Sequence, residues 1–248
     1  AAVAIGLILH ASGAGHLIDR AVAPSPFFWD HARSAAHVHI MGGWSPYSRV
    51  DFYRAPNGTL AGLYNGAQQW MVAPSPARDF CVRRELYARF RGDVLLIGAG
   101  GGQGLVDLQS ARSVTGVELD PFVVSAMRGP LAHWNAAAYH ANQIFAGDGR
   151  TFLERTDRLY DTIILEGTDI TVSQLNQSVI AFESGLYTRE GLALAASRLT
   201  AGGILLALHT WNPVPTARFV AGLPEGMHCA TWQGIARAEG ASFPTRAT

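Results

Sequence analysis

Short apolar runs alternate with amphipathic stretches along the second half of the chain. Five runs have the length and the branched, apolar composition of strands buried on both faces: 94–97, 114–119, 143–146, 160–165 and 204–208. Segments with helical spacing lie between them, and two begin at Pro121 and Thr188, residue types that favour the start of a helix. This alternation predicts a parallel, doubly wound sheet with right-handed crossovers.

The pattern before residue 77 predicts a different kind of unit. Two strand-like runs, SRVDFYR and TLAGLYNGAQQW, are separated by APNG, which is a strong turn signal. The proline-rich segment APSPAR then indicates a linker. The sequence therefore predicts an α/β protein in which a small N-terminal β-hairpin domain over 44–76 precedes a Rossmann-like domain over 77–248. The sheet of that second domain is expected to be doubly wound and mainly parallel.

Residues 1–43 form a separate N-terminal segment. Residues 1–9 are apolar but shorter than the roughly 20 residues that span a bilayer. We keep two interpretations: a helix packed on the domain, or the end of a longer, membrane-linked chain. His31, His37 and His39 lie close together without a cysteine or carboxylate at ligand spacing. We interpret them as solvated loop histidines and predict no metal site.

The composition excludes several classes of function. Lysine plus arginine and aspartate plus glutamate both number 19, so the net charge of zero gives no support for nucleic-acid binding. All the basic residues are arginine, which excludes a Walker A lysine and a Schiff-base lysine. Cys81 and Cys229 set no disulfide framework and fit a reducing compartment. We expect a cytoplasmic protein, or one associated with the cytoplasmic side of a membrane.

One stretch indicates a nucleoside-type ligand. The strand at 94–97 is followed at once by Gly98, Gly100 and Gly102, and the next strand ends in Glu118. Strand, glycine turn, helix, strand and acid form the layout of a nucleoside-binding unit, in which the acid takes the two ribose hydroxyls. The alternative is a tight turn in a sheet without a ligand.

From about Trp44 to about Trp211 the chain resembles spermidine synthases and their aminopropyltransferase-like relatives, within the class I S-adenosylmethionine-dependent transferases. The matching pieces, in order, are SPYSRVDFYR, LYNGAQQ, RDFCVRRE, VLLIGAGGG, VTGVELDP, GDGRTFL, YDTIILEGTD, and LYTREG with AGGILLAL. The resemblance implies a hairpin domain over a Rossmann-like sheet that binds S-adenosylmethionine or its decarboxylated form, with no metal.

The resemblance also implies which residues hold this donor. By it, Glu118 binds the ribose hydroxyls, Asp148 takes the adenine amino group, and Gln69 faces the donor from the hairpin domain. The glycines lie beneath the sulfonium and the ribose. The implied set is Gln69, Gly98, Gly100, Gly102, Glu118, Asp148 and Gly149. For Asp148, a turn aspartate in a GDG loop is the alternative.

The residues for the acceptor depart from the family pattern. Glu166 stands where the family has an aspartate base, Asp169 survives as a second acid, and Arg83 falls where the family has a tyrosine. Glu166 is either a base or a polar cap on the pocket. A like charge disfavours a diamine, so we expect little reaction with putrescine, and Arg83 to bind an anionic group of the substrate. A surface arginine is the alternative.

We therefore expect a spermidine synthase-like transferase that acts on a small-molecule acceptor other than putrescine. Three alternatives stay open: a true spermidine synthase, a small-molecule methyltransferase, and a non-catalytic cofactor-binding domain of a larger membrane assembly. A homodimer and a membrane-bound parent chain are the partners that this interpretation allows, and nucleic acid is not among them.

Overall fold

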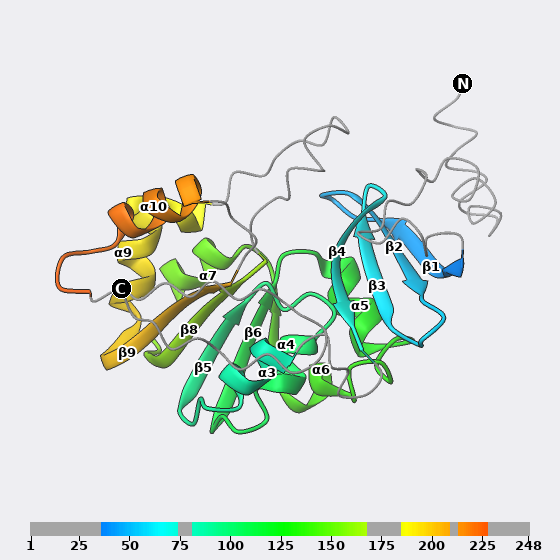
Figure 1. Cartoon of the computed structure of the whole chain (residues 1–248), viewed down its shortest axis with the longest axis horizontal. Coiled ribbons are helices and arrows are strands. Elements are labelled where there is room, and N and C mark those ends of the chain that lie inside the picture. Colours follow the sequence, from blue (N-terminus) through cyan, green and yellow to red (C-terminus); the bar gives the residue numbers. More distant parts are fainter. Residues whose placement is uncertain (1–35, 74–80, 168–184, 209–212, 228–248) are drawn as a thin grey trace.

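The computed structural model describes residues 36–73, 81–167, 185–208 and 213–227. Two β-sheets organise this part of the chain (Figure 1). A four-stranded sheet has the order β1-β2-β3-β4, and a five-stranded sheet has the order β7-β6-β5-β8-β9. Helices cover the larger sheet, whereas the smaller sheet lies beside it and packs against α5 (Pro121–Arg128) and the glycine loop after β5 (Asp93–Ile97).

The smaller sheet is antiparallel throughout. Its strands are β1 (Val38–Trp44), β2 (Arg49–Arg54), β3 (Leu60–Tyr64) and β4 (Ala67–Val72). The run TLAGLYNGAQQW contains two strands and not one, because Asn65 and Gly66 both adopt positive φ and make the two-residue turn that joins neighbouring antiparallel strands. β1 begins inside the segment predicted to precede the hairpin unit.

The first strand changes the interpretation of one histidine. His39 lies in β1, not in a loop, and its Nε2 is 2.9 Å from Oδ1 of Asp51. Arg49 donates to both oxygens of the same carboxylate, which is buried. This polar cluster joins β1 to β2. His31 lies outside the described residues.

The larger sheet is parallel. Its strands are β5 (Asp93–Ile97), β6 (Ser113–Glu118), β7 (Gln143–Ala146), β8 (Tyr160–Glu166) and β9 (Leu199–Leu208). β5 lies in the middle, the chain passes to β6 and β7 on one side, and it returns to β8 and β9 on the other. The doubly wound, Rossmann-like sheet is therefore confirmed.

Helices cover both faces of this sheet. They are α3 (Cys81–Tyr87), α4 (Gln103–Asp107), α5 (Pro121–Arg128), α6 (Ala138–Ala141), α7 (Gly149–Arg155), the 3-10 helix η3 (Gly185–Tyr187), α9 (Arg189–Ser197) and α10 (Pro213–Gly222). Apolar residues of α4, α5 and α6 pack in one hydrophobic cluster, and those of α7, α9 and α10 in another. The predicted caps form: Pro121 begins α5, and the Thr188 hydroxyl accepts from the Gly191 amide.

The last strand differs from its prediction. β9 begins at Leu199, so Gly202 and Gly203 lie inside the strand and not before it. On β8, Tyr160 pairs with Leu199 whereas Thr162 already pairs with Ile204. The residues between them bulge out of the ladder, which glycine permits because Gly202 adopts a φ of 78°.

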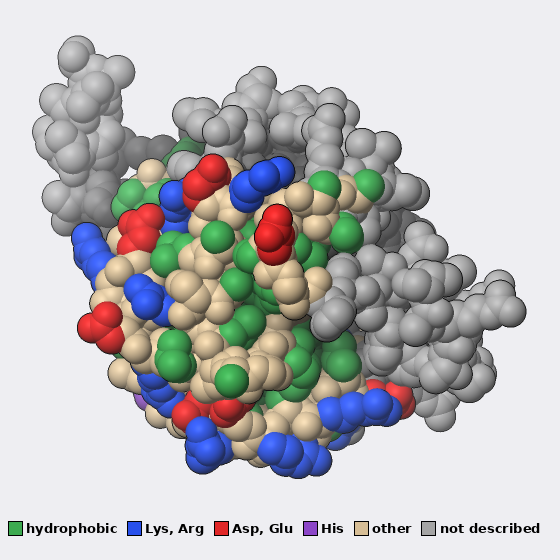
Figure 2. All heavy atoms as spheres, turned by 90° about the vertical axis from the view of Figure 1, so that its left-hand side faces the viewer, with side chains coloured by type: hydrophobic (Ala, Val, Ile, Leu, Met, Phe, Trp, Pro, Cys, Tyr) green, Lys and Arg blue, Asp and Glu red, His purple; other side chains and the backbone are tan. Residues whose placement is uncertain are grey.

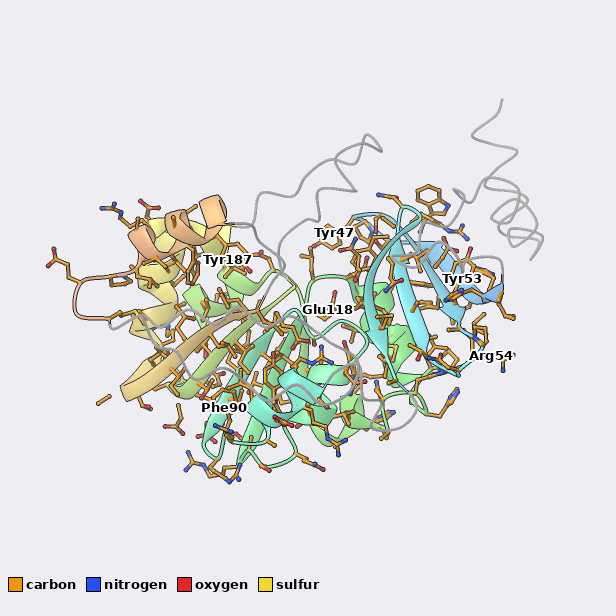
Figure 3. The ribbon with its side chains drawn as sticks, viewed as in Figure 1. Tyr47, Tyr53, Arg54, Phe90, Glu118 and Tyr187 are labelled. Carbon is orange, nitrogen blue, oxygen red and sulfur yellow. The ribbon has the colours of Figure 1, made fainter. Side chains whose placement is uncertain are left out.

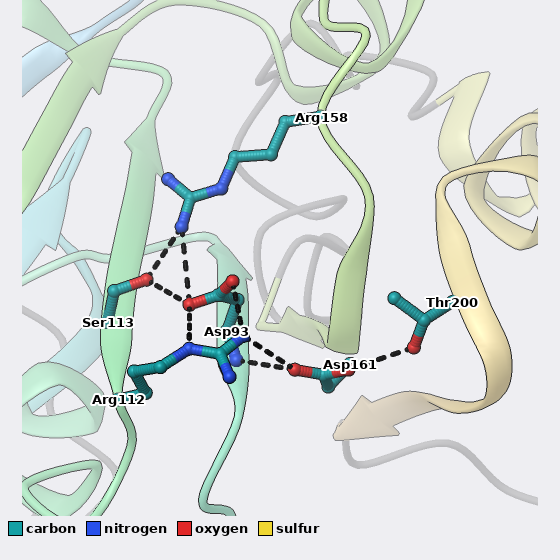
Figure 4. A network of polar contacts seen from close by, with 6 residues as sticks. All are labelled: Asp93, Arg112, Ser113, Arg158, Asp161 and Thr200. Atoms are coloured by element: carbon teal, nitrogen blue, oxygen red, sulfur yellow. Dashed lines mark hydrogen bonds and ion pairs between the residues drawn. The ribbon is translucent and has the colours of Figure 1, made fainter.

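A polar network closes the edge of the sheet where the strands begin (Figure 4). It consists of Asp93, Arg112, Ser113, Arg158, Asp161 and Thr200. Arg112 donates from Nη2 to Asp93 at 2.7 Å, and Asp161 accepts from the Asp93 amide at 2.8 Å. This network connects β5, β6, β8 and β9 at the edge opposite to Glu118.

Neither acidic nor basic side chains dominate the surface at the end of the molecule that carries β9 and α10. Figure 2 views this end, and acidic and basic side chains alternate there with hydrophobic ones. Ile204 on β9 and Val220 on α10 are among the exposed hydrophobic residues. None of the helices in the described ranges is long and apolar enough to cross a membrane.

Candidate functional site

The loop after β5 has a backbone that favours glycine. Gly98, Gly100 and Gly102 have φ values of 91°, 51° and 91°, a region that other residues rarely adopt. The amide of Gly98 donates to the carbonyl of Val117 on β6, at 2.9 Å. The loop therefore turns tightly over the carboxyl ends of β5 and β6 and presents main chain rather than side chains.

Both main-chain polar groups of Gly100 are hydrogen-bonded. Its amide donates to Oε2 of Glu118 at 2.7 Å, and its carbonyl accepts from the Tyr139 hydroxyl at 2.5 Å. Glu118 comes from the end of β6, and Tyr139 comes from α6. The predicted ribose-binding acid is thus joined directly to the predicted glycine loop.

Glu118 is buried between the two sheets, as Figure 3 shows. Its Oε1 accepts from the amide of Asp120 at 3.0 Å and from the hydroxyl of Tyr64 at 3.4 Å. Burial raises the pKa of this carboxyl, and the hydrogen bonds from the two amides act in the opposite direction. The donor from Tyr64 was not apparent from sequence, because β3 is distant from β6 along the chain.

Trp70 closes the smaller sheet over the glycine loop. A Cβ at Gly101 would lie 2.5 Å from its ring, and one at Gly62 on β3 would lie 2.2 Å from it. The indole Nε1 donates to the Tyr64 hydroxyl at 3.5 Å. Burial raises the pKa of Tyr64 well above its ordinary value, and the nearby carboxylate of Glu118 raises it further. Trp70 and Tyr64 therefore connect the smaller sheet to Glu118.

Gln69 lies at an irregularity of β4. Gly62 pairs with Trp70 and Leu63 pairs with Gln68, so Gln69 has no partner residue on β3. Such a bulge changes the direction of side chains and is common beside functional sites. The Gln69 Nε2 is buried and has no hydrogen-bond partner in the part of the chain that the structure describes. A buried amide without a partner is costly, so this side chain fits one that a ligand completes.

Asp148 and Gly149 follow β7, next to the end of β6. The amide of Gly147 donates to the main-chain carbonyl of Glu118 at 2.8 Å, which fixes this neighbourhood. Asp148 is exposed, and its carboxylate caps α7 by accepting from the Thr151 amide at 2.7 Å. Gly149 packs against Ile97, where a Cβ would lie 2.4 Å away. Both predicted residues therefore lie at the same sheet edge as Glu118.

A cavity of about 460 Å³ also opens beside Asp148. It runs along β7 and α7, and its lining includes Phe145, Phe152 and Arg155. Glu118 and the glycine loop do not line it. The cavity thus extends away from the predicted donor site, and we base no binding role on its size.

Glu166 lies in a second polar cluster. Its Oε1 accepts from Nη1 of Arg83 at 2.7 Å, and its Oε2 accepts from the Tyr87 hydroxyl at 2.8 Å. Arg83 also donates from Nε to Asp107 at 3.1 Å. The carboxylates of Glu166 and Asp107 raise the pKa of Arg83, against the effect of its burial. Both oxygens of Glu166 are thus bound by groups of α3.

Two members of this cluster were missed at the level of sequence, and each had a signal. Tyr87 follows Arg83 by one helical turn, so the two side chains lie on the same face of α3. Asp107 follows Gln103 by the same spacing on α4, and the Gln103 Nε2 donates to it at 3.1 Å. The partner of Arg83 could not be identified, because α3 and β8 are far apart in the sequence.

The glycine loop and α4 separate the two predicted acids. Glu118 binds the amide of Gly100, whereas a Cβ at Gly104 would lie 2.5 Å from Oε2 of Glu166. The glycine loop thus contacts Glu118, and α4 contacts Glu166. Asp169, the other predicted catalytic acid, lies outside the described residues.

The predicted donor site contains polar groups of the kind that a ribose and its substituents bind. They are the acid at the end of β6, the main-chain loop and the unpartnered Nε2 of Gln69. Within the described ranges, no group of three or more His, Cys, Asp or Glu residues is arranged to hold a metal ion.

Comparison with known proteins identifies the family of this chain. A family model described as the spermine/spermidine synthase domain matches residues 88–212. Polyamine aminopropyltransferase 2 of Pseudomonas aeruginosa is 36% identical over 118 residues, which are 46% of this chain and 32% of that protein. The polyamine aminopropyltransferase of Sulfolobus acidocaldarius is 32% identical over 82 residues, 31% of this chain and 27% of that protein. The matches thus span about a third of these relatives.

Solved structures share the fold. The spermidine synthase from Thermotoga maritima superposes with a TM-score of 0.56 and 21% identity, over 74% of this chain and 61% of that one. A spermidine synthase in complex with the transition-state analogue AdoDATO gives a TM-score of 0.53 and 20% identity, over 74% and 60% of the two chains.

Proposed function

Because this chain belongs to the spermine/spermidine synthase domain family, we propose that it binds an S-adenosyl donor and transfers an alkyl group from it to a small molecule. The observation that carries this proposal is the direct bond between Glu118 and the glycine loop, with the unpartnered Nε2 of Gln69 in the smaller sheet. Homologues named polyamine aminopropyltransferases support an enzyme of this class.

The proposed roles are those that the family resemblance implies, and the side chains in place are compatible with them. Glu118 accepts hydrogen bonds from the ribose hydroxyls, and Asp148 accepts one from the adenine amino group. Gln69 donates its free amide from the smaller sheet. The glycine loop allows the ligand to approach the main chain closely. The donor, S-adenosylmethionine or its decarboxylated form, supplies a carbon made electrophilic by the adjacent sulfonium.

The ion pairs of Arg83 change the reason why we expect putrescine to be an unfavourable acceptor. Arg83 is paired with Glu166 and Asp107, so its charge is compensated and does not by itself repel an amine. The same pairing uses the carboxylates that a diamine would need, because Arg83 holds both acids. We therefore keep putrescine as an unfavourable acceptor, for want of a free carboxylate in this cluster.

The acceptor side defines a second candidate function. Each oxygen of Glu166 already accepts one hydrogen bond, from Arg83 or from Tyr87, and keeps one acceptor position at which it could take a proton. A domain in which this carboxylate serves only the ion pair would bind the donor without transferring anything. The engaged state of Glu166 is the observation that favours this non-catalytic function, and a true spermidine synthase and a small-molecule methyltransferase complete the alternatives.

Two measurements test the proposal. Calorimetric titration with S-adenosylmethionine, its decarboxylated form and methylthioadenosine should show binding that Glu118→Ala weakens. A product assay with a set of amines then distinguishes the functions: methylthioadenosine indicates aminopropyl transfer, S-adenosylhomocysteine indicates methyl transfer, and no product with retained binding indicates the non-catalytic domain. Absence of binding by all three ligands to the folded protein contradicts the proposal.

A further inference from the structure

The hydrogen bonds of Glu118 leave little room for a second ligand hydroxyl. A carboxylate offers about four acceptor positions, two on each oxygen. On Oε1 both are in use, by the amide of Asp120 and the hydroxyl of Tyr64. On Oε2 one is in use, by the amide of Gly100. One position therefore remains, whereas the two hydroxyls of a ribose need two.

The three protein donors differ in how firmly they are held. The amides of Gly100 and Asp120 belong to main chain and lie 2.7 and 3.0 Å from the carboxylate. Gly100 is further fixed by Tyr139, and Asp120 caps α5 through its side chain. The Tyr64 hydroxyl is 3.4 Å away, the longest of the three distances, and it is the one donor on a side chain. It is the donor that a ligand can replace at least cost.

Building on the proposed function, we propose that Tyr64 is a displaceable hydrogen-bond donor that determines how Glu118 distinguishes a ribose from a deoxyribose. A ligand with one hydroxyl uses the free position on Oε2 and leaves Tyr64 in place. A ligand with two adjacent hydroxyls must also take the position of the Tyr64 hydroxyl on Oε1. The diol therefore binds less favourably than it would if the Tyr64 hydroxyl did not occupy this position on the carboxylate.

The displaced hydroxyl remains connected to the smaller sheet. Trp70 donates to it from β4, and the Trp70 ring rests on Gly100 and Gly101. Movement of Tyr64 therefore acts on the contact between β4 and the glycine loop. Binding of a diol is expected to change the contact at this junction between the two sheets, whereas binding of a deoxy ligand is not.

The test compares methylthioadenosine with its 2′-deoxy counterpart by calorimetry on the whole chain. In Tyr64→Phe the diol no longer competes with a hydroxyl, so methylthioadenosine should bind about threefold to tenfold more tightly. Affinity for the deoxy ligand should change by less than about twofold, since Tyr64 stays in place when that ligand binds. Tyr64→Leu also lacks the hydroxyl and repeats the comparison if Tyr64→Phe does not fold.

Tyr53→Phe is the matched control. Tyr53 lies on the other face of the smaller sheet, packed with Ala61, Leu63 and Met71, and away from Glu118 (Figure 3). It should leave the ratio of the two affinities unchanged. If Tyr64→Phe also leaves the ratio unchanged or lowers it while both ligands bind, the inference fails and the proposed function stands. If neither ligand binds the folded wild-type protein, both fail.

Discussion

Arg83 and Glu166 form an ion pair of 2.7 Å that joins α3 to the end of β8. Both side chains are 15% exposed, and Arg83 also holds Asp107, of which 3% is exposed. An arginine that looked from sequence like a free charge in a substrate pocket is therefore the centre of a compensated cluster. Its removal would leave two carboxylates close together in a nearly dry place.

The first prediction concerns the stability of this cluster. Arg83→Met should lower the free energy of unfolding by about 3–5 kcal/mol, because breaking a buried ion pair leaves uncompensated charge. Glu166→Gln should have a smaller effect, about 1–3 kcal/mol, since Arg83 keeps Asp107 as its partner. Denaturant unfolding of both variants and of the double variant checks this. Additive effects in the double variant would show that the two residues are not coupled.

The second prediction concerns the acceptor. Arg83→Tyr frees two acids and introduces a hydroxyl, so putrescine should bind about tenfold or more tightly to this variant than to the wild-type chain. Isothermal titration with putrescine in the presence of methylthioadenosine measures this. Arg84→Tyr, at the next and exposed position of α3, is the control. Equal affinity in the wild-type chain and Arg83→Tyr would place the acceptor away from this cluster.

The third prediction concerns the donor. Glu118→Ala should weaken binding of an adenosyl ligand by about 1.5–3 kcal/mol, because hydrogen bonds to a charged acceptor are lost. Asp148→Ala should weaken binding less, and it should also destabilise the protein by about 1 kcal/mol, since Asp148 caps α7. Asp157→Ala, at an exposed position, serves as control. Unchanged affinity in both site variants would mean that the adenosine site lies elsewhere.

The fourth prediction concerns pH. The pKa of Glu118 is raised above 4.5, the ordinary value, mainly by burial, and Tyr64, Tyr139 and Asp120 are the other titratable groups that face it. A protonated carboxyl is a poorer acceptor for hydroxyls, so affinity should fall as the pH falls through this raised pKa. The loss should approach about tenfold per pH unit on the acid side. Titrations from neutral pH downward, over the range in which the protein stays folded, check this, with Glu118→Gln expected to show no such dependence.

Much of the larger domain could be predicted because its signals are local. The strand at 143–146, the start of α5 at Pro121 and the cap at Thr188 each depend on residues within one turn or one run. Glu118 could be placed against the glycine loop because parallel neighbouring strands end at one edge. The fourth strand of the smaller sheet was overlooked because Asn65-Gly66 was treated as strand interior.

The contacts between distant segments could not be predicted. No local pattern joins Tyr64 to Glu118 or Arg83 to Glu166, because each pair is brought together only by the packing of separate elements. The positive charge of Arg83 is evident from the sequence, but the acids of α4 and β8 that compensate it could not be identified there. Predicting the charge balance of this cluster therefore needs the contacts between distant segments, whereas predicting the nucleotide-type fold needs only local patterns.

At the bulge, the regular sheet has no need of Gln69, whereas the proposed site does. On either side of it Gly62 pairs with Trp70 and Leu63 pairs with Gln68, so deleting Gln69 alone would leave a regular ladder with these pairs intact. The sheet does not require this residue, and its buried Nε2 has no hydrogen-bond partner among the described residues. Loss of one codon would therefore remove the proposed ligand contact of Gln69 while leaving the architecture complete, and its gain would restore that contact.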